Sequence, residues 1–187
     1  MDKFLFNKLC NKYSPIITKL INQNIKFYRF HETIRWQFGF DERVAIVASC
    51  NKTNNILTIN VASVDFAFQR NEPLMIEYFL LHEIRHLYQH LEIADYKNCP
   101  SKCIDPLLAK KWAEEEANYV TALNNQDHEN AAYFQQDIEF DAYVFAYAVL
   151  KYKYQNLPDY IFRPKAYGQE FDDLVDKWCK TFENEKL

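Results

Sequence analysis

The chain has 187 residues, 49% of them hydrophobic and 17% aromatic, so it can bury a substantial core and is not expected to be disordered. Its net charge is −4, and no run of Lys and Arg is long enough to neutralise a row of phosphates, which argues against nucleic acid as a direct partner. With only two glycines, Gly39 and Gly168, a glycine-rich loop for phosphate or a dinucleotide is effectively excluded.

The first part of the chain predicts helix followed by a small sheet. An apolar stripe of Phe4, Leu5 and Leu9 predicts a helix, and Ser14-Pro15 predicts the start of a second one that ends near Asn22. From about residue 25 to 64, aromatic and β-branched residues favour strands. The predicted strands are 25–30, 35–38, 44–49 and 56–61, the last two joined by a polar loop of hairpin length, so we expect an antiparallel sheet.

After Asn71 the pattern is helical almost to the end of the chain. Proline positions and apolar residues at helical spacing predict helices at about 72–93, 105–123, 129–154 and 169–183. No repeat, low-complexity segment or linker divides the chain. We therefore expect one α+β domain over residues 1–187, with a small antiparallel sheet at about residues 25–64 packed on a mostly helical C-terminal two-thirds.

Two features of the sequence bear on the compartment in which the protein works: its five cysteines are scattered, and it has no long apolar segment. Cys99 and Cys103 are closely spaced, but no second Cys/His pair of matching spacing accompanies them, so ordinary reduced thiols are expected rather than a structural zinc site. No segment has the length and character of a signal peptide or a membrane span. These features predict a cytoplasmic protein without a membrane partner.

The segment 81–86, Leu-His-Glu-Ile-Arg-His, carries the pattern with the clearest chemistry. His82 and His86 are four residues apart, so on a helix they lie on one face and can bind the same metal ion. Glu83 would lie beside an open position of that ion, where it can accept a proton from water and later return it to a leaving amine. A pair of imidazoles with an open position suits Zn²⁺.

At these residues the chain resembles the gluzincin-type zinc metallopeptidases, which carry the HExxH motif on a helix below a small sheet. In that group a glutamate from a later helix completes the metal site, often within E-x-x-A followed by F-A. Residues 139–146, Glu-Phe-Asp-Ala-Tyr-Val-Phe-Ala, look like this pattern. The resemblance covers about residues 56–150 and extends to small metallopeptidase-like proteins of phages and mobile elements, some of them repressor-cleaving. It implies a zincin-like fold.

The third metal ligand is expected to be a glutamate. His90 lies eight residues after His82, about 12 Å along a helix, which is too far for both to bind one ion, so His90 is interpreted as a residue at the rim of the site. Glu139 shares a predicted helix face with small and apolar residues, where a carboxylate needs a partner or a metal. Glu115 occupies a similar face and stays open as the alternative. His31 and His128 are expected on the surface.

Three further residues near the motif have two interpretations each. Arg85 departs from the family pattern, which usually has an uncharged residue there because the helix is buried. It would extend to solvent or pair with an acid, and it weakens the case for proteolysis. Asp141 would pair with Arg85 or orient a ligand histidine through its ring N–H. Tyr143 would donate its phenol to the oxyanion that develops on a substrate carbonyl, or would simply pack.

These residues support three hypotheses. In the first, the protein is a zinc peptidase in which His82, His86 and Glu139 hold the ion, Glu83 is the general base, and a protein or peptide is the substrate. In the second, zinc serves a catalytically weak or inactive regulatory or protein-interaction module, which Arg85 and the short chain favour. In the third, no metal binds and the acidic helical surface engages a protein partner. An open metal position beside Glu83 would distinguish the first hypothesis from the second.

Overall fold

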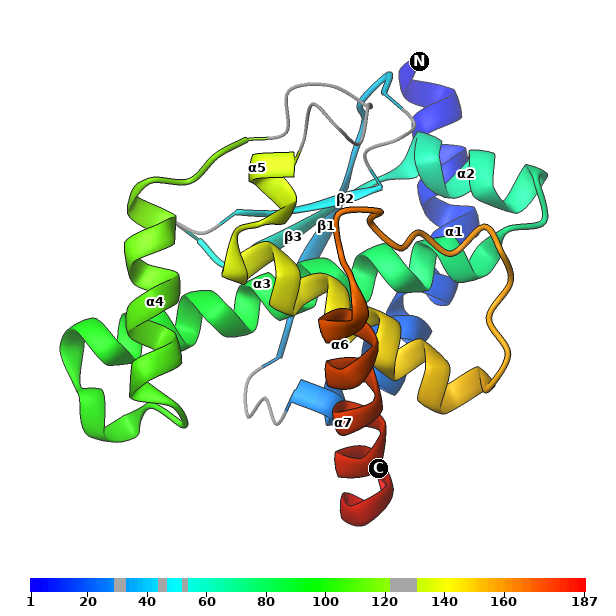
Figure 1. The fold of residues 1–187 in the computed structure, drawn as a ribbon. Coiled ribbons are helices and arrows are strands. Elements are labelled where there is room, and N and C mark those ends of the chain that lie inside the picture. The colour runs from blue at the N-terminus through cyan, green and yellow to red at the C-terminus, as the bar shows by residue number, and fades with distance from the viewer. Residues whose placement is uncertain (29–32, 44–46, 52–53, 122–130) are drawn as a thin grey trace.

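The computed structural model describes residues 1–28, 33–43, 47–51, 54–121 and 131–187. These residues form seven α-helices and a three-stranded sheet, so the predicted α+β class is confirmed (Figure 1). In chain order the elements are α1 (Lys3–Asn24), the 3-10 helix η1 (Ile25–Tyr28), β1 (Arg35–Gly39), β2 (Ala48–Asn51), β3 (Ile56–Asn60), α2 (Val61–Gln69), α3 (Pro73–Asn98), the 3-10 helix η2 (Pro100–Lys102), α4 (Pro106–Ala117), α5 (Ala131–Phe134), α6 (Asp137–Tyr154) and α7 (Gln169–Glu185). Across the described part of the chain, no helix combines the length and the apolar character that a bilayer crossing requires.

β3 is the central strand of the sheet, whose order is β1-β3-β2. It pairs antiparallel with β2, with Ser49 opposite Thr58, which confirms the predicted hairpin. It pairs in parallel with β1, so the expectation of a purely antiparallel sheet is wrong. The consecutive strands β1 and β2 do not pair with each other but flank β3. A hairpin joins β2 to β3, so these two strands run in opposite directions, whereas β1 and β3 run in the same direction.

The N-terminal helix is longer than expected. Ser14-Pro15 does not begin a second helix, because α1 continues through Pro15. Tyr13, Ile17 and Ile21 form one buried face across that point. Their burial offsets the hydrogen bond that the proline nitrogen cannot donate, so the packing of the helix outweighs the local signal for a new start.

Several other predicted boundaries also differ, and tertiary contacts or local caps outweigh strand or helix propensity at them. Residues 25–28, predicted as strand, form η1 with buried aromatic side chains, and residues 29–30 of that predicted strand lie outside the described residues. The sheet ends at Asn60, whose side chain accepts the N–H of Ala62 and begins α2 where strand was expected. The helix predicted at 129–154 is interrupted between α5 and α6.

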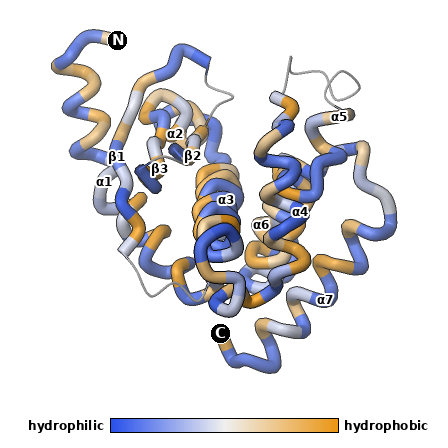
Figure 2. Tube along the Cα trace, turned by 90° about the vertical axis from the view of Figure 1, so that its left-hand side faces the viewer, coloured by the Kyte–Doolittle hydropathy of each residue, from blue (hydrophilic) through white to orange (hydrophobic). Residues whose placement is uncertain are grey.

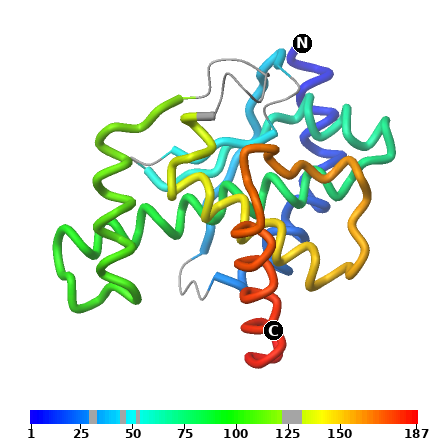
Figure 3. Tube along the Cα trace, in the orientation of Figure 1, coloured from blue at the N-terminus to red at the C-terminus, as the bar shows by residue number. Residues whose placement is uncertain are grey.

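α3 is the axis of the fold and carries the predicted metal-binding motif. It runs between a layer formed by the sheet with α1 and α2 and a layer formed by α4 and α6 (Figure 2). α7 lies beside α6 near one end of the molecule, away from the N-terminus (Figure 3). Because α3 has neighbours on both sides, apolar side chains cover much of its circumference. Its buried apolar residues are Ile76, Tyr78, Leu80, Leu81, Ile84, Leu87 and Ile93.

Candidate metal centre

α3 and α6 bring the three predicted metal ligands together. The Nε2 atoms of His82 and His86 are 3.0 Å apart. One carboxylate oxygen of Glu139 lies 3.4 Å from His82 Nε2, and the other lies 3.4 Å from His86 Nε2. One ligand atom from each residue lies within 4.8 Å of the other two, and no second such group of His, Cys, Asp or Glu occurs among the described residues. The arrangement therefore has the donor atoms and spacing of a three-residue metal site.

The charges in this group fit a divalent cation. Burial alone would raise the pKa of Glu139, but the neighbouring His86 and His82 hold that pKa well below its usual value. Burial opposes a charge on His86, yet the Glu139 carboxylate raises the pKa of His86 to about 9. The buried carboxylate thus draws a positive charge into the group, which a metal ion supplies in place of a proton. Two imidazole nitrogens and one carboxylate oxygen suit Zn²⁺.

Gln89 fixes the ring of His86. Its Oε1 lies 2.7 Å from His86 Nδ1, while its Nε2 donates to the backbone carbonyl of Ile138 and to Asp141 Oδ2. Because the Gln89 amide group donates on its other side, His86 Nδ1 must carry the proton that Oε1 accepts. Nε2 of His86, which faces Glu139, is then the nitrogen available to a metal, and the ion would displace the second proton that the raised pKa of His86 favours without it.

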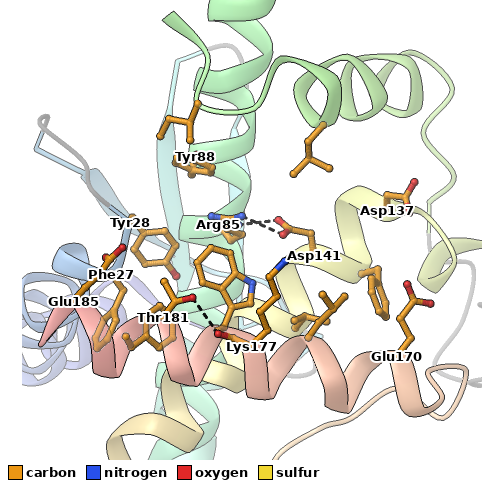
Figure 4. Close-up of a pocket in the computed structure, with 17 residues that line it drawn as sticks. Phe27, Tyr28, Arg85, Tyr88, Asp137, Asp141, Glu170, Lys177, Thr181 and Glu185 are labelled. Carbon is orange, nitrogen blue, oxygen red and sulfur yellow. Dashed lines mark hydrogen bonds and ion pairs between the residues drawn. The ribbon is translucent and has the colours of Figure 1, made fainter.

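Arg85 belongs to the same network, although zinc metallopeptidases that carry the HExxH motif usually have an uncharged residue at this position. It is buried, and its guanidinium donates to both oxygens of Asp141 at 2.8 and 3.1 Å (Figure 4). Rings of Tyr88 and Phe145 each lie 4.5 Å from the guanidinium carbon. The predicted ion pair is therefore confirmed, and Arg85 does not extend to solvent. Asp141 also accepts from Gln89, so the pair supports the ligand histidine indirectly.

We expect Gln89→Leu to lower zinc affinity by about 10- to 100-fold, the usual cost of losing a group that orients a metal-bound histidine. The leucine cannot accept the proton of His86 Nδ1, so the ring loses its fixed tautomer and orientation. Competition with a chromophoric chelator measures the affinity. Gln23→Leu, an exposed position on α1, is the matched control and should bind zinc as the wild type does. Equal affinities in all three proteins would contradict this role for Gln89.

Glu115 has a different function from the one considered for it. Its two carboxylate oxygens accept the backbone N–H groups of Asp137 and Ile138, each at 2.9 Å. These are the first residues of α6, so Glu115 caps the helix that carries Glu139. Glu139, rather than Glu115, therefore lies with the two histidines.

Glu83 lines a cavity of 260 Å³ next to the candidate ligands, together with His86 and Glu139. Its carboxylate accepts the backbone N–H of Cys50 from the edge strand β2. Burial raises the pKa of Glu83, and the nearby charge of Glu139 raises it further, while the two histidines act in the opposite direction. A carboxylate with a raised pKa holds a proton more readily than an exposed one, which suits a group that accepts and releases a proton beside the candidate ligands.

Two tyrosines that sequence reasoning does not identify are hydrogen-bonded to the candidate ligand Glu139. Tyr119 and Tyr133 line the cavity, and each donates a hydrogen bond to a different oxygen of Glu139. With 13 tyrosines in the chain, no local pattern singles these two out. Tyr143 packs its buried ring against His82, with ring centroids 4.2 Å apart, and its phenol is hydrogen-bonded to that of Tyr133. His82 Nδ1 is buried without a hydrogen-bond partner among the described residues. The catalytic role of Tyr143 stays a prediction.

His90 lines the same cavity and is not one of the three candidate ligands, as expected. All five cysteines are free thiols. His31 and His128 lie outside the described residues. No protein-family model, curated protein or solved structure matches this chain, so any function has to be argued from the site itself.

Proposed function

We propose that this protein is a zinc-dependent peptidase of the gluzincin type, with a zincin-like fold, that hydrolyses a protein or peptide substrate in the cytoplasm. The single observation that carries the proposal is the buried group of His82, His86 and Glu139 beside a cavity that Glu83 lines. The predicted phage or mobile-element origin rests on the sequence resemblance alone.

In this mechanism each residue of the site has a defined role. When bound, Zn²⁺ supplies a Lewis acid that polarises the substrate carbonyl and lowers the pKa of water towards neutrality. His82, His86 and Glu139 hold the ion, and Gln89 keeps His86 in the ligating tautomer. Glu83 takes the proton of the attacking water and passes it to the leaving amine nitrogen. The Cys50 N–H keeps the Glu83 carboxylate aimed from the side of the sheet.

The position of the edge strand indicates how a peptide would bind. Ser49 and Cys50 of β2 form one wall of the cavity, and β2 pairs with another strand only on the side of β3 among the described residues. An extended peptide can add to such an edge through backbone hydrogen bonds. Its scissile bond would then lie between β2 and the helix α3 that carries Glu83.

The second candidate is a zinc-binding regulatory module without peptidase activity. The observation that favours it is the pair of phenols, Tyr119 and Tyr133, that donate to Glu139 and share the small cavity. A phenol that became a fourth protein ligand would close the metal site, and closed four-coordinate sites are structural. Spectroscopy of the cobalt-substituted protein distinguishes the two, because an open site changes its absorption when azide is added.

The first test is elemental analysis of the purified protein beside His86→Ala and His90→Ala. We expect about one zinc per chain in the wild type and in His90→Ala, and loss of zinc in His86→Ala, because His86 belongs to the ligand group and His90 does not. The absence of zinc from all three proteins after incubation with the metal would refute the metal centre. Zinc retained in His86→Ala would show that it binds elsewhere.

A further inference from the structure

A thiol, an imidazole and a carboxylate from three elements lie side by side in the wall of the cavity. Cys50 belongs to β2, His90 to α3 and Glu116 to α4. The sulfur of Cys50 lies 3.6 Å from His90 Nδ1, and His90 Nε2 lies 3.6 Å from a carboxylate oxygen of Glu116. The side chains of His90 and Glu116 are 12% and 18% exposed, and Cys50 is half-buried. One ring thus joins the thiol on one side to a carboxylate on the other.

This order of groups is the one that activates a nucleophile. A thiol reacts as its thiolate, and an adjacent imidazole can take its proton. A carboxylate at the second ring nitrogen orients the imidazole and stabilises it once it is protonated. Lys97 lies 3.5 Å from the other oxygen of Glu116 and favours the charged carboxylate.

We propose that Cys50 is a reactive thiol, activated by His90 and Glu116, that undergoes exchange with low-molecular-weight disulfides of the glutathione type. The site is separate from the three metal ligands and requires no metal. Nothing in the peptidase mechanism above uses the side chain of Cys50, His90 or Glu116.

The exchange is balanced in protons and electrons. The proton of the Cys50 thiol passes to His90 Nδ1, and the thiolate attacks one sulfur of the disulfide. The sulfur–sulfur bond of the reagent breaks as the bond to Cys50 forms. The leaving thiolate keeps the electron pair of the broken bond and takes the proton from His90. One disulfide and one thiol are consumed, and one mixed disulfide and one thiol are produced.

Other charges in the cavity make the thiolate dependent on His90. The carboxylates of Glu83 and Glu139 share the cavity with Cys50 and oppose a second negative charge, while the phenols of Tyr119 and Tyr133 are bound to Glu139. Among the described residues that line the cavity, the other side chain that can carry a positive charge is His86, which lies 3.4 Å from Glu139. The imidazolium of His90, directly beside the sulfur, is therefore the described charge that is best placed to stabilise the thiolate.

The other cysteines provide internal controls. Burial raises the pKa of Cys10, Cys103 and Cys179, which disfavours their thiolates. The thiol of Cys103 donates to the backbone carbonyl of Glu92, and that of Cys179 donates to the carbonyl of Ala148. None of these arrangements places a base beside the sulfur.

A mixed disulfide at Cys50 would also affect the proposed peptidase. Cys50 and Glu83 line the same cavity, so a tripeptide attached to the sulfur would occupy the space next to the general base. This consequence rests on the proposed function, whereas the reactivity of Cys50 does not. Thiol reduction would restore access, which makes the modification reversible.

The test uses oxidised glutathione with the full chain near pH 7.5 and follows the mass of the peptide around each cysteine with time. Cys50 should react at least about tenfold faster than each of the other four cysteines. His90→Gln should slow Cys50 at least about tenfold, and Glu116→Gln should slow it to a smaller extent. Glu114→Gln, an exposed carboxylate on the same helix α4, is the matched control and should have no effect.

Two readouts separate activation from a change of fold. The rate at Cys179 should be the same in all variants, because its partner is a backbone carbonyl on α6. The rate of alkylation of Cys50 by iodoacetamide should reach half its maximum at a pH below the ordinary thiol value of about 8.5, and His90→Gln should move this midpoint upwards. A Cys50 that reacts no faster than the other cysteines, or that is unaffected by His90→Gln while Cys179 is unchanged, would overturn the proposal.

Measurements with zinc added and after treatment with a chelator keep this proposal distinct from the peptidase. A reactive Cys50 in a protein that binds no zinc supports the thiol proposal and counts only against the metal centre. An unreactive Cys50 in a zinc-loaded, active peptidase counts only against the thiol proposal.

Discussion

Replacing Glu83 with glutamine is expected to lower kcat/KM for peptide hydrolysis by about 10²- to 10⁴-fold while zinc still binds at about one equivalent. Glutamine has the size of glutamate, and its carbonyl oxygen can still accept the N–H of Cys50 that holds Glu83 in place. It cannot take a proton from water. The change therefore removes the base and leaves the three ligands untouched.

The measurement needs activity and metal content from the same preparations. A mixture of unstructured peptides, with products identified by mass spectrometry, serves as the substrate, and elemental analysis gives the zinc content. Glu114→Gln, with an exposed side chain on α4, controls for the loss of a carboxylate at a distance from the cavity. Full activity in Glu83→Gln would exclude Glu83 as the base. Loss of both zinc and activity would assign it a structural role instead.

The parts of the site that follow a local period could be predicted from the sequence. The spacing of His82, Glu83 and His86 needs only a helix to bring two ring nitrogens to one ion, and α3 provides that helix. Glu139 could be predicted for a similar reason, because a carboxylate on an apolar helix face needs a buried partner. The hairpin of β2 and β3 also follows from two strand-like segments around a short polar loop.

The groups that orient the ligands could not be predicted, because each contact joins segments far apart in the chain. Gln89 holds His86 from one turn away, but its anchors, Asp141 and Ile138, lie on α6. Tyr119, which follows the end of α4, and Tyr133 of α5 meet at Glu139, and no local pattern in the sequence signals this meeting. Three-dimensional packing decides these contacts, and periodicity describes only one element at a time.

Arg85 is a charged residue at a position where HExxH helices usually have an uncharged one, and its ion pair with Asp141 explains how it is accommodated. A charged residue in a buried helix is costly unless its charge is neutralised and its N–H groups are bonded. Asp141 supplies both, and the aromatic rings around the guanidinium fill the remaining space. Since Asp141 also accepts a hydrogen bond from the amide of Gln89, the ion pair helps to fix the residue that orients His86 in the candidate metal site. Arg85 therefore does not argue against a functional site.

Replacing Glu139 or Glu115 with glutamine should separate a metal ligand from a helix cap. Glu139→Gln removes the charged ligand between His82 and His86, so zinc affinity should fall by more than the roughly 100-fold upper range seen for groups that only orient a ligand. Glu115→Gln weakens the hydrogen bonds to the first residues of α6 and should cost about 1 kcal/mol of unfolding free energy. Its zinc affinity should remain within a few-fold of the wild type.

Competition with a chromophoric chelator measures both affinities, and denaturant unfolding of the metal-free proteins measures both stabilities. Opposite patterns are expected because Glu139 would bind the ion directly. Glu115 instead accepts the N–H groups of Asp137 and Ile138 and so stabilises the start of α6. Wild-type zinc affinity in Glu139→Gln would remove Glu139 from the ligand set. A large loss of affinity in Glu115→Gln, with unfolding free energy unchanged, would return Glu115 to it, because a cap that does not affect stability could influence zinc only through direct contact with the ion.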